Sequence, residues 1–203
     1  MKKGCLIGIG AAVLIAVIAF FMFKNYYNNF VTLEEGVNEK WSQVENVYQR
    51  RADLIPNLVE VVKGYAGHEK ETLMGVTEAR AKVGGQVNIG PDVLNNPQAL
   101  AKFQQAQGAL SGALSRLLVT VERYPDLKAN QNFLQLQGAW NEVEEQISAS
   151  RRAFNASVTI FNNGVETFPS NIMAGIMNYK RKALFEIPDE ERQNVNAKDL
   201  FNK

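Results

Sequence analysis

The residues with the most distinctive chemistry in this chain lie in one segment, 49–59, which reads Gln-Arg-Arg-Ala-Asp-Leu-Ile-Pro-Asn-Leu-Val. Pro56 interrupts a helical pattern there. It has no backbone donor and its ring clashes with the carbonyl of Ala52, so we expect a kink at this point. The carbonyl that loses its donor needs another partner, and the candidates are Arg50, Arg51 and Asn57.

Arg51 falls on the apolar side of the helical pattern, between Tyr48 and Ile55. A buried guanidinium has to pair with a carboxylate or with carbonyl groups, because an unpaired buried charge is strongly destabilising. Two interpretations follow: a polar lock that fixes the register of neighbouring helices, or a docking point for a partner. The residues of this structural lock or docking segment are Arg50, Arg51, Asp53, Pro56 and Asn57.

The other reactive side chains form no recognisable catalytic or metal-binding motif. Cys5 has no histidine near it in the sequence, and His68, the one histidine, does not follow a glutamate at the spacing of a di-metal carboxylate bundle. The acidic cluster Glu142, Glu144 and Glu145 is expected to solvate a helix surface. We therefore expect a protein that is not an enzyme, with no cofactor, metal or small-molecule substrate.

The charge balance excludes a further class of partner. Lysine and arginine number 22 against 21 aspartate and glutamate, a net charge of +1. Nucleic-acid binding requires clustered cations that displace counterions, so we expect no nucleic-acid partner. Without the three lysines near the N-terminus, residues 25–203 carry 19 basic and 21 acidic groups, and no basic patch predicts a second membrane contact.

Residues 4–23 contain no charge and are almost entirely apolar. As a helix with about 1.5 Å rise per residue, they reach about 30 Å, the thickness of a bilayer's hydrocarbon core. A cleaved signal peptide is the alternative, but this run is longer than usual and no small-residue cleavage site follows it. We assign residues 1–24 as a single-pass anchor in a cell membrane. The positive-inside rule favours a body on the outer (periplasmic or extracellular) side by about one charge.

Residues 25–188 are expected to form the helical body. Apolar residues recur there at alternating steps of three and four, which is typical of helical bundles. Three long segments show the pattern, beginning near Val37, Leu100 and Phe133, and a shorter one follows Ser170. The predicted fold is all-α: a single transmembrane helix followed by an antiparallel bundle of three long helices and one shorter helix.

The boundaries between these segments are marked by glycine and proline. The first pattern can continue past Gly67 until Gly84 and Gly85 end it, and a loop then extends to Pro97. The second segment carries many alanine, glycine and serine residues, so neighbouring helices could approach it closely. Residues 189–203 are polar and are expected to form a frayed or docked tail.

A polar row follows the third segment at seven-residue spacing: Asn141, Ser148, Asn155 and Asn162. Buried amides at such positions can specify how helices pair. A solvated helix face fits the same pattern, since spacing alone does not show whether polar residues are buried. Both interpretations stay open at this point.

Several strings of this sequence, taken in order, resemble the bacterial LemA family over nearly the whole chain. The most specific is Arg-Arg-Ala-Asp-Leu-Ile-Pro-Asn-Leu-Val at 50–59. Supporting strings lie at 38–44, 68–69, 79–80, 124–129, 151–155, 161–162, 168–169 and 185–186. The resemblance implies a bundle of long helices on a membrane anchor, with no established catalytic activity or cofactor. It also implies links to membrane proteostasis, stress response or specialised membrane compartments, and in some relatives an amino terminus on the outer side.

The function expected from these features is a non-catalytic, membrane-tethered scaffold or adaptor of the LemA type. Such a protein would contact the lipid bilayer through residues 4–23 and bind a partner protein, or a second copy of itself, through one face of the bundle. One alternative is a self-assembling structural protein that organises a membrane patch or compartment. Another is an accessory subunit of a membrane enzyme such as a protease.

Overall fold

The computed structural model describes residues 2–86 and 90–186, and every regular element in these ranges is helical. The helices are α1 Lys2–Ala66, α2 Lys70–Gln86, the short 3-10 helix η1 Pro91–Asn95, α3 Pro97–Val121, α4 Pro125–Lys128, α5 Gln131–Glu166 and α6 Ser170–Ile176. The predicted all-α fold is confirmed. The polar tail predicted at 189–203 lies outside the described residues.

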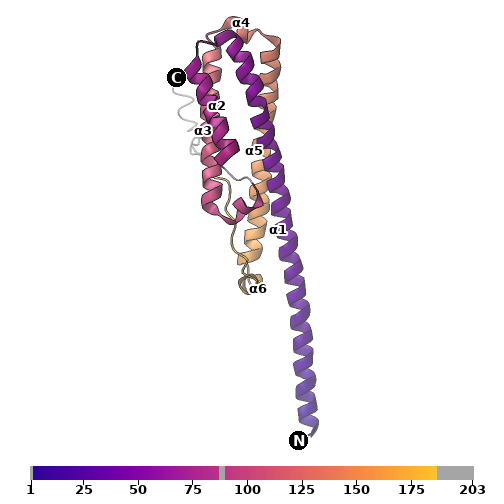
Figure 1. Ribbon diagram of the computed structural model, residues 1–203. Coiled ribbons are helices and arrows are strands. Elements are labelled where there is room, and N and C mark those ends of the chain that lie inside the picture. The colour runs from indigo at the N-terminus through magenta and orange to yellow at the C-terminus, as the bar shows by residue number, and fades with distance from the viewer. Residues whose placement is uncertain (1, 87–89, 187–203) are drawn as a thin grey trace, which may run out of the picture.

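α1 is a single helix of 65 residues that joins the apolar segment to the body (Figure 1). Its lower part stands free, and every described side chain from 7 to 25 is exposed. Among the described residues α1 is the helix long and apolar enough to cross a membrane. Helix α1 passes without a break through the boundary that we placed between residues 24 and 25, so the anchor and the body share one continuous rod.

The body is built on the upper part of α1. α5 runs antiparallel to α1 along most of the body, and α2 and α3 pair on the other side (Figure 1). Asn96 caps α3 by accepting hydrogen bonds from the backbone N–H groups of Gln98 and Ala99, and Asn130 caps α5 through the N–H of Phe133.

One expected boundary is wrong. The first helix does not continue past Gly67: α1 ends at Ala66, and after a short turn α2 runs back along the bundle (Figure 1). Reversing direction lets α2 bury its apolar face against α3, which a straight extension of α1 would leave in solvent. The stop expected at Gly84 and Gly85 agrees with the end of α2 at Gln86 to within the usual one or two residues. A helix tolerates glycine at a cost of about 1 kcal/mol when its other residues are packed.

The core has two parts. The membrane-proximal core is rich in aromatic side chains, and its buried members include Trp41, Tyr48, Phe103, Phe154, Phe161 and Phe185. The membrane-distal core is mostly aliphatic, and its buried members include Ile55, Leu58, Val76, Leu110, Leu114 and Leu117. Both parts use residues of the three-and-four pattern, which therefore predicted the buried faces of α1 and α3.

Candidate functional site

Arg51 is buried, with 2% of its surface exposed, and it joins three helices. Its Nη1 donates to Ser111 Oγ at 3.1 Å and to Glu144 Oε1 at 3.2 Å. Its Nη2 donates to the backbone oxygen of Gln107 at 3.3 Å and also to the Gln107 side-chain oxygen. These contacts connect α1 to α3 and α5, as a register lock requires.

Aromatic rings enclose the same guanidinium. Its central carbon lies 5.0 Å from the ring centroid of Tyr48 and 6.0 Å from that of Trp140, within the range of cation–π attraction. Burial lowers the pKa of Arg51 below its usual value, and the nearby Glu144 carboxylate opposes that effect. Burial likewise raises the pKa of Tyr48, against the nearby Arg151 and Arg51 cations. The hydrogen-bonding demand is not fully met, because Arg51 Nε and Gln107 Nε2 are buried without a partner.

This polar layer separates the two cores along all three helices. On α1, Arg51 lies between Tyr48 of the membrane-proximal core and Ile55 of the membrane-distal core. On α3, Gln107 lies between Phe103 and Leu110 in the same way. Sliding any one of these helices by a turn would unpair the guanidinium, as the register-lock interpretation requires.

The structure does not bring the other predicted lock residues into this layer. Arg50, Asp53, Pro56 and Asn57 are exposed on the outer face of α1. Arg50 reaches across to α5, where it lies 3.6 Å from a Glu142 oxygen and donates to Gln146 at 3.3 Å. Asp53 accepts a hydrogen bond from Gln49 on its own helix at 2.9 Å. The segment therefore has one inward-facing residue and a solvated outer surface.

The carbonyl released by Pro56 has a partner that the sequence analysis missed. Arg80 of α2 donates from its Nε to the Ala52 oxygen at 3.0 Å, so none of the three expected residues fills this role. Pro56 lies inside α1, which remains one helix on both sides of it. The partner lies 28 residues away, on a helix whose reversal at Gly67 was not expected. Glu144 was also assigned wrongly, because it is the carboxylate that pairs with Arg51.

The polar row on α5 is partly a solvated face and partly buried amides, so each of the two interpretations holds for some of its residues. Asn141 and Ser148 are exposed and belong to a solvated face. Asn155 and Asn162 instead hold the chain after α6. The Asn162 side chain donates to the Lys182 carbonyl and accepts from the Lys182 N–H, both at 2.9 Å. Asn155 does the same with Phe185, at 3.1 and 2.8 Å. Each amide thus replaces the backbone partner that a β-strand would supply.

This amide clamp seals the membrane-proximal core with residues 179–186, which have no regular secondary structure. The Phe185 ring packs against Trp41 and Phe154, with centroids 6.0 and 5.4 Å away. Lys182 is buried, and its Nζ lies 2.9 Å from a Glu34 oxygen on α1 and donates to the Asn95 side chain at 2.9 Å. No periodic signal marks such a segment, although the seven-residue spacing of the two asparagines was visible.

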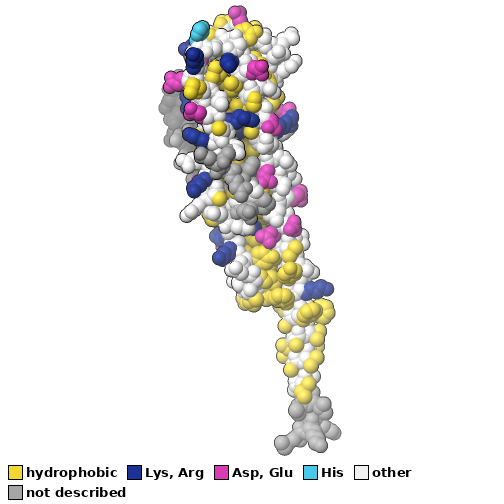
Figure 2. Space-filling model, in the orientation of Figure 1, with side chains coloured by type: hydrophobic (Ala, Val, Ile, Leu, Met, Phe, Trp, Pro, Cys, Tyr) yellow, Lys and Arg dark blue, Asp and Glu magenta, His cyan; other side chains and the backbone are white. Residues whose placement is uncertain are grey.

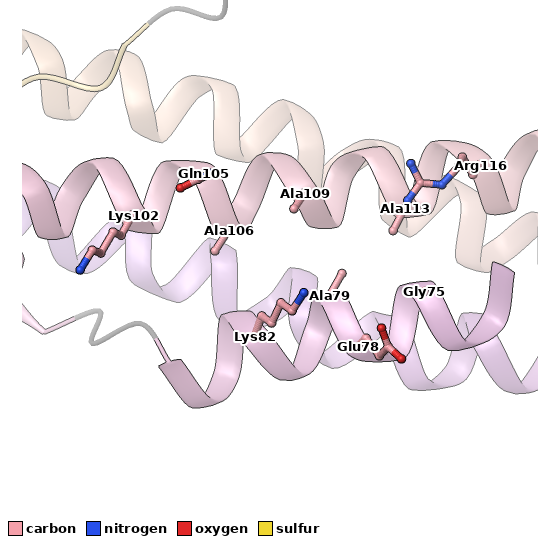
Figure 3. A pocket seen from close by; sticks show the side chains of 10 residues that line it. All are labelled: Gly75, Glu78, Ala79, Lys82, Lys102, Gln105, Ala106, Ala109, Ala113 and Arg116. Carbon is pink, nitrogen blue, oxygen red and sulfur yellow. The ribbon is translucent and has the colours of Figure 1, made fainter. Parts of the chain in front are cut away.

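A groove opens between α2 and α3 in the membrane-distal half, with a volume of about 520 Å³ (Figure 3). Its floor consists of small residues: Gly75, Ala79, Ala106, Ala109 and Ala113. The charged residues along it are Glu78, Lys82, Lys102 and Arg116. Within 2–86 and 90–186, no carboxylate forms an ion pair with any of the three cations. The groove thus combines a slim floor with a net positive rim.

Metal binding is not indicated in the described part of the chain. Among residues 2–86 and 90–186, no three side chains of His, Cys, Asp or Glu gather closely enough to hold an ion. His68 is exposed in the turn between α1 and α2. The arrangement that the structure does provide is a polar layer that bonds three helices, a clamp that covers one core, and an open groove beside the other.

Taken together, these features define a class: a membrane-associated helical bundle carried on a single N-terminal apolar helix. Comparison with known proteins makes the class specific. The profile of the LemA family matches residues 40–198, and the chain belongs to this family. The resemblance noted in the sequence is confirmed.

Individual relatives come from two groups. Protein LemA of Metamycoplasma hominis is 26% identical over 185 residues, which cover 91% of this chain and 80% of that protein. Magnetosome protein MamQ 2 of Paramagnetospirillum magneticum is 27% identical, covering 85% of this chain and 68% of the relative. Magnetosome protein MamQ of Magnetospirillum gryphiswaldense is also 27% identical, covering 89% and 71%. The likeness extends over most of each chain.

Proposed function

We propose that this protein is a non-catalytic, membrane-tethered adaptor that binds a helical segment of a partner protein in the groove between α2 and α3. The open groove is the observation that carries the proposal. A helix backbone can approach closely where the floor is formed by alanine and glycine, and a side chain added at Gly75 would meet no neighbour within 4 Å. We propose the outer side of the membrane for the groove, because the positive-inside rule favours that side by about one charge.

The chemistry of the rim selects the partner. Lys82, Lys102 and Arg116 outnumber Glu78, so the complementary segment carries acidic side chains along one face. Arg116 can form paired hydrogen bonds with a carboxylate, which would fix the register of the bound helix. The polar layer next to the groove holds α3 in place through Gln107 and Ser111, so the groove is already formed before binding.

Site-specific photo-crosslinking of the full-length protein in intact cells tests this proposal. A photoreactive residue at Ala109, on the groove floor, should capture one partner protein in stoichiometric amount. The same residue at Ala149, exposed on α5, is the control position and should capture none. Arg116→Glu should abolish the capture at position 109, because the partner's carboxylate would then face a like charge. Arg152→Glu, an exposed charge reversal on α5, should leave the capture unchanged.

The identity of the captured protein is then tested by charge exchange. Changing the contacting acidic residue of the partner to lysine should restore its capture by the Arg116→Glu variant. Equal capture at positions 109 and 149, insensitivity to Arg116→Glu, or a crosslink from position 109 to residues 187–203 of the same chain would each contradict the proposal.

Self-assembly is the second candidate, and the free surface of α3 favours it. A Cβ added at Gly108 would meet no neighbour within 4 Å, so this part of the helix is open to close approach by another copy. Crosslinked ladders of this chain alone, from a photoreactive residue at position 108, would support a structural scaffold and contradict the adaptor.

A further inference from the structure

Besides the apolar surface of the anchor, exposed apolar side chains lie at the lower end of the body, around α6. Phe168, Ile172 and Ile176 are 75%, 56% and 67% exposed, although each is a large apolar side chain. Solvent-exposed apolar side chains gathered in one place mark an interaction site rather than an ordinary surface. We call Phe168, Ile172 and Ile176 the α6 tip.

The tip is placed at the level where α1 leaves the bilayer. Near the end of α5, a Cβ built on Gly164 would lie 2.8 Å from the Leu33 side chain, so this end packs beside Leu33 of α1. The Tyr179 ring, just after α6, stacks on Phe30 with centroids 5.0 Å apart. Phe30 is seven residues above Phe23, the end of the charge-free apolar run, or about 10 Å along the helix.

α6 extends further in the direction of the anchor. Figure 1 shows it below the end of α5, beside α1 and close to the free part of that helix. Figure 2 shows apolar side chains over this lower end of the body that continue into the apolar surface of α1 below. The apolar surface of the tip is therefore continuous with the membrane-spanning surface.

The charges around the tip suit a lipid surface. Residues 167–179 contain no charged side chain. The carboxylate just before them, Glu166, lies 2.9 Å from Arg181 and is neutralised by it. Lys24 and Lys180 are exposed at the edges of this region, where ammonium groups can meet headgroup phosphates. Burying this surface in water-free lipid therefore requires no uncompensated carboxylate to enter it.

We propose that the α6 tip enters the boundary between headgroups and acyl chains in the same leaflet from which α1 emerges. The body then touches the membrane at two points, its anchor helix and its α6 tip. No basic patch in the sequence predicts a second membrane contact. The contact proposed here is made by apolar side chains, which that criterion does not detect. Two attachment points fix the rotation of the body about α1, and so determine which direction the α2–α3 groove faces along the membrane.

Spin-label depth measurements on the full-length protein test the inference. Cys5 is first replaced by serine, and single cysteines are introduced at Ile172 or Ile176 for labelling in vesicles of phosphatidylethanolamine and phosphatidylglycerol. The readout is the ratio of accessibility to oxygen, which concentrates in lipid, and to a water-soluble nickel chelate. Position 20, within the apolar segment, gives the value for lipid. Position 119 gives the value for water, since Val119 is 71% exposed in the membrane-distal half.

Labels at positions 172 and 176 should give ratios shifted from the value at 119 toward the value at 20. Ratios equal to that at 119 would overturn the inference. Low accessibility to both reagents would also overturn it, because the tip would then be covered by protein. Spin–spin broadening between labels would identify that protein as a second copy. Circular dichroism of each labelled protein verifies that the helices are intact, and none of these outcomes depends on the proposed partner.

Discussion

The two halves of the body reach the same helical architecture by different packing. In the membrane-proximal half, Trp41 meets Phe103, Phe154 and Phe185 at centroid distances of 5.7, 5.5 and 6.0 Å. Large rings fill this core and the amide clamp covers it, and a pocket of about 500 Å³ stays open beside the clamp, lined by Glu34, Asn95 and Lys182 among others. The membrane-distal half has branched aliphatic side chains inside and a small-residue groove outside. The half next to the membrane is thus packed with rings and held by side-chain amides, whereas the half farther away is packed with aliphatic side chains and carries small residues along its groove.

The division also separates mechanical roles. In the proposed arrangement, the anchor and the α6 tip position the proximal half, and its closely packed interior passes that position on to the rest of the bundle, since such interiors deform little. A groove with alanine and glycine on its floor can receive another helix without rearranging the core. The Arg51 layer lies between the halves and bonds α1 to α3 and α5. Each of these elements can be altered separately.

The largest effect is expected at the layer itself. Arg51→Ala removes a buried cation that bonds to α3 and α5, and leaves Gln107 buried with fewer partners, so it should lower the free energy of unfolding by about 3 kcal/mol. Denaturant unfolding of the full-length protein in detergent micelles measures this change. Hydrogen exchange should show that amides in both halves lose protection, because the layer contacts both cores.

An apolar replacement is the matched control for that prediction. Arg51→Met combined with Gln107→Leu removes the two buried polar side chains of the layer and should recover most of the lost stability, because Ser111 and Glu144 are partly exposed and can bind water instead. This double variant should also retain partner capture at position 109. Lost capture with unchanged helicity and unfolding would show that Arg51 acts in docking rather than in register, against the interpretation adopted above.

The contrast between the halves also shows what the sequence could predict. The three-and-four pattern correctly gave the buried positions of α1 from Val37 to Val62, because periodic apolar residues must share one face of a helix. The same pattern continues from Val62 to Tyr65 and predicts that Tyr65 is buried, but Tyr65 is 45% exposed and its neighbour Ala66 is buried instead. A straight helix has 3.6 residues per turn, whereas a seven-residue repeat corresponds to 3.5. Positions chosen by that repeat therefore move gradually off the buried face over several turns.

The site was less predictable than the helices. That Arg51 would be buried and paired followed from its position, but its partners on α3 and α5 depend on the helix alignment, which is a property of the whole fold. The amide clamp depends on residues 179–186, which have no periodicity, so nothing local indicates that Phe185 enters a core. The groove between α2 and α3 could not be expected while α2 was read as a continuation of α1.

The second prediction concerns a substitution that should destabilise only the membrane-proximal half. Asn162→Ala removes both hydrogen bonds to Lys182 and leaves a buried backbone N–H and carbonyl without partners, which should cost about 2 kcal/mol. Trypsin should then cleave faster after Lys180, Arg181 and Lys182. Asn141→Ala is the matched control, since it occupies the same heptad position of α5 but is exposed; its effect should stay within about 0.5 kcal/mol. Equal cleavage of both variants would mean that the clamp does not hold this segment.

The smallest effect concerns the membrane-distal half alone, where Arg80 bonds to the Ala52 carbonyl. Arg80→Met should lower the free energy of unfolding by about 0.5–1 kcal/mol, because the hydrogen bond is partly open to solvent. In a Pro56→Ala background, residue 56 regains an N–H that can donate to Ala52, so the same change at Arg80 should cost almost nothing. A double-mutant cycle measured by denaturant unfolding gives the coupling directly. Lys82→Met, an exposed cation on the same helix, should cost the same in both backgrounds. If Arg80→Met also costs the same in both, then Arg80 stabilises α2 by some means other than satisfying the carbonyl that Pro56 leaves free.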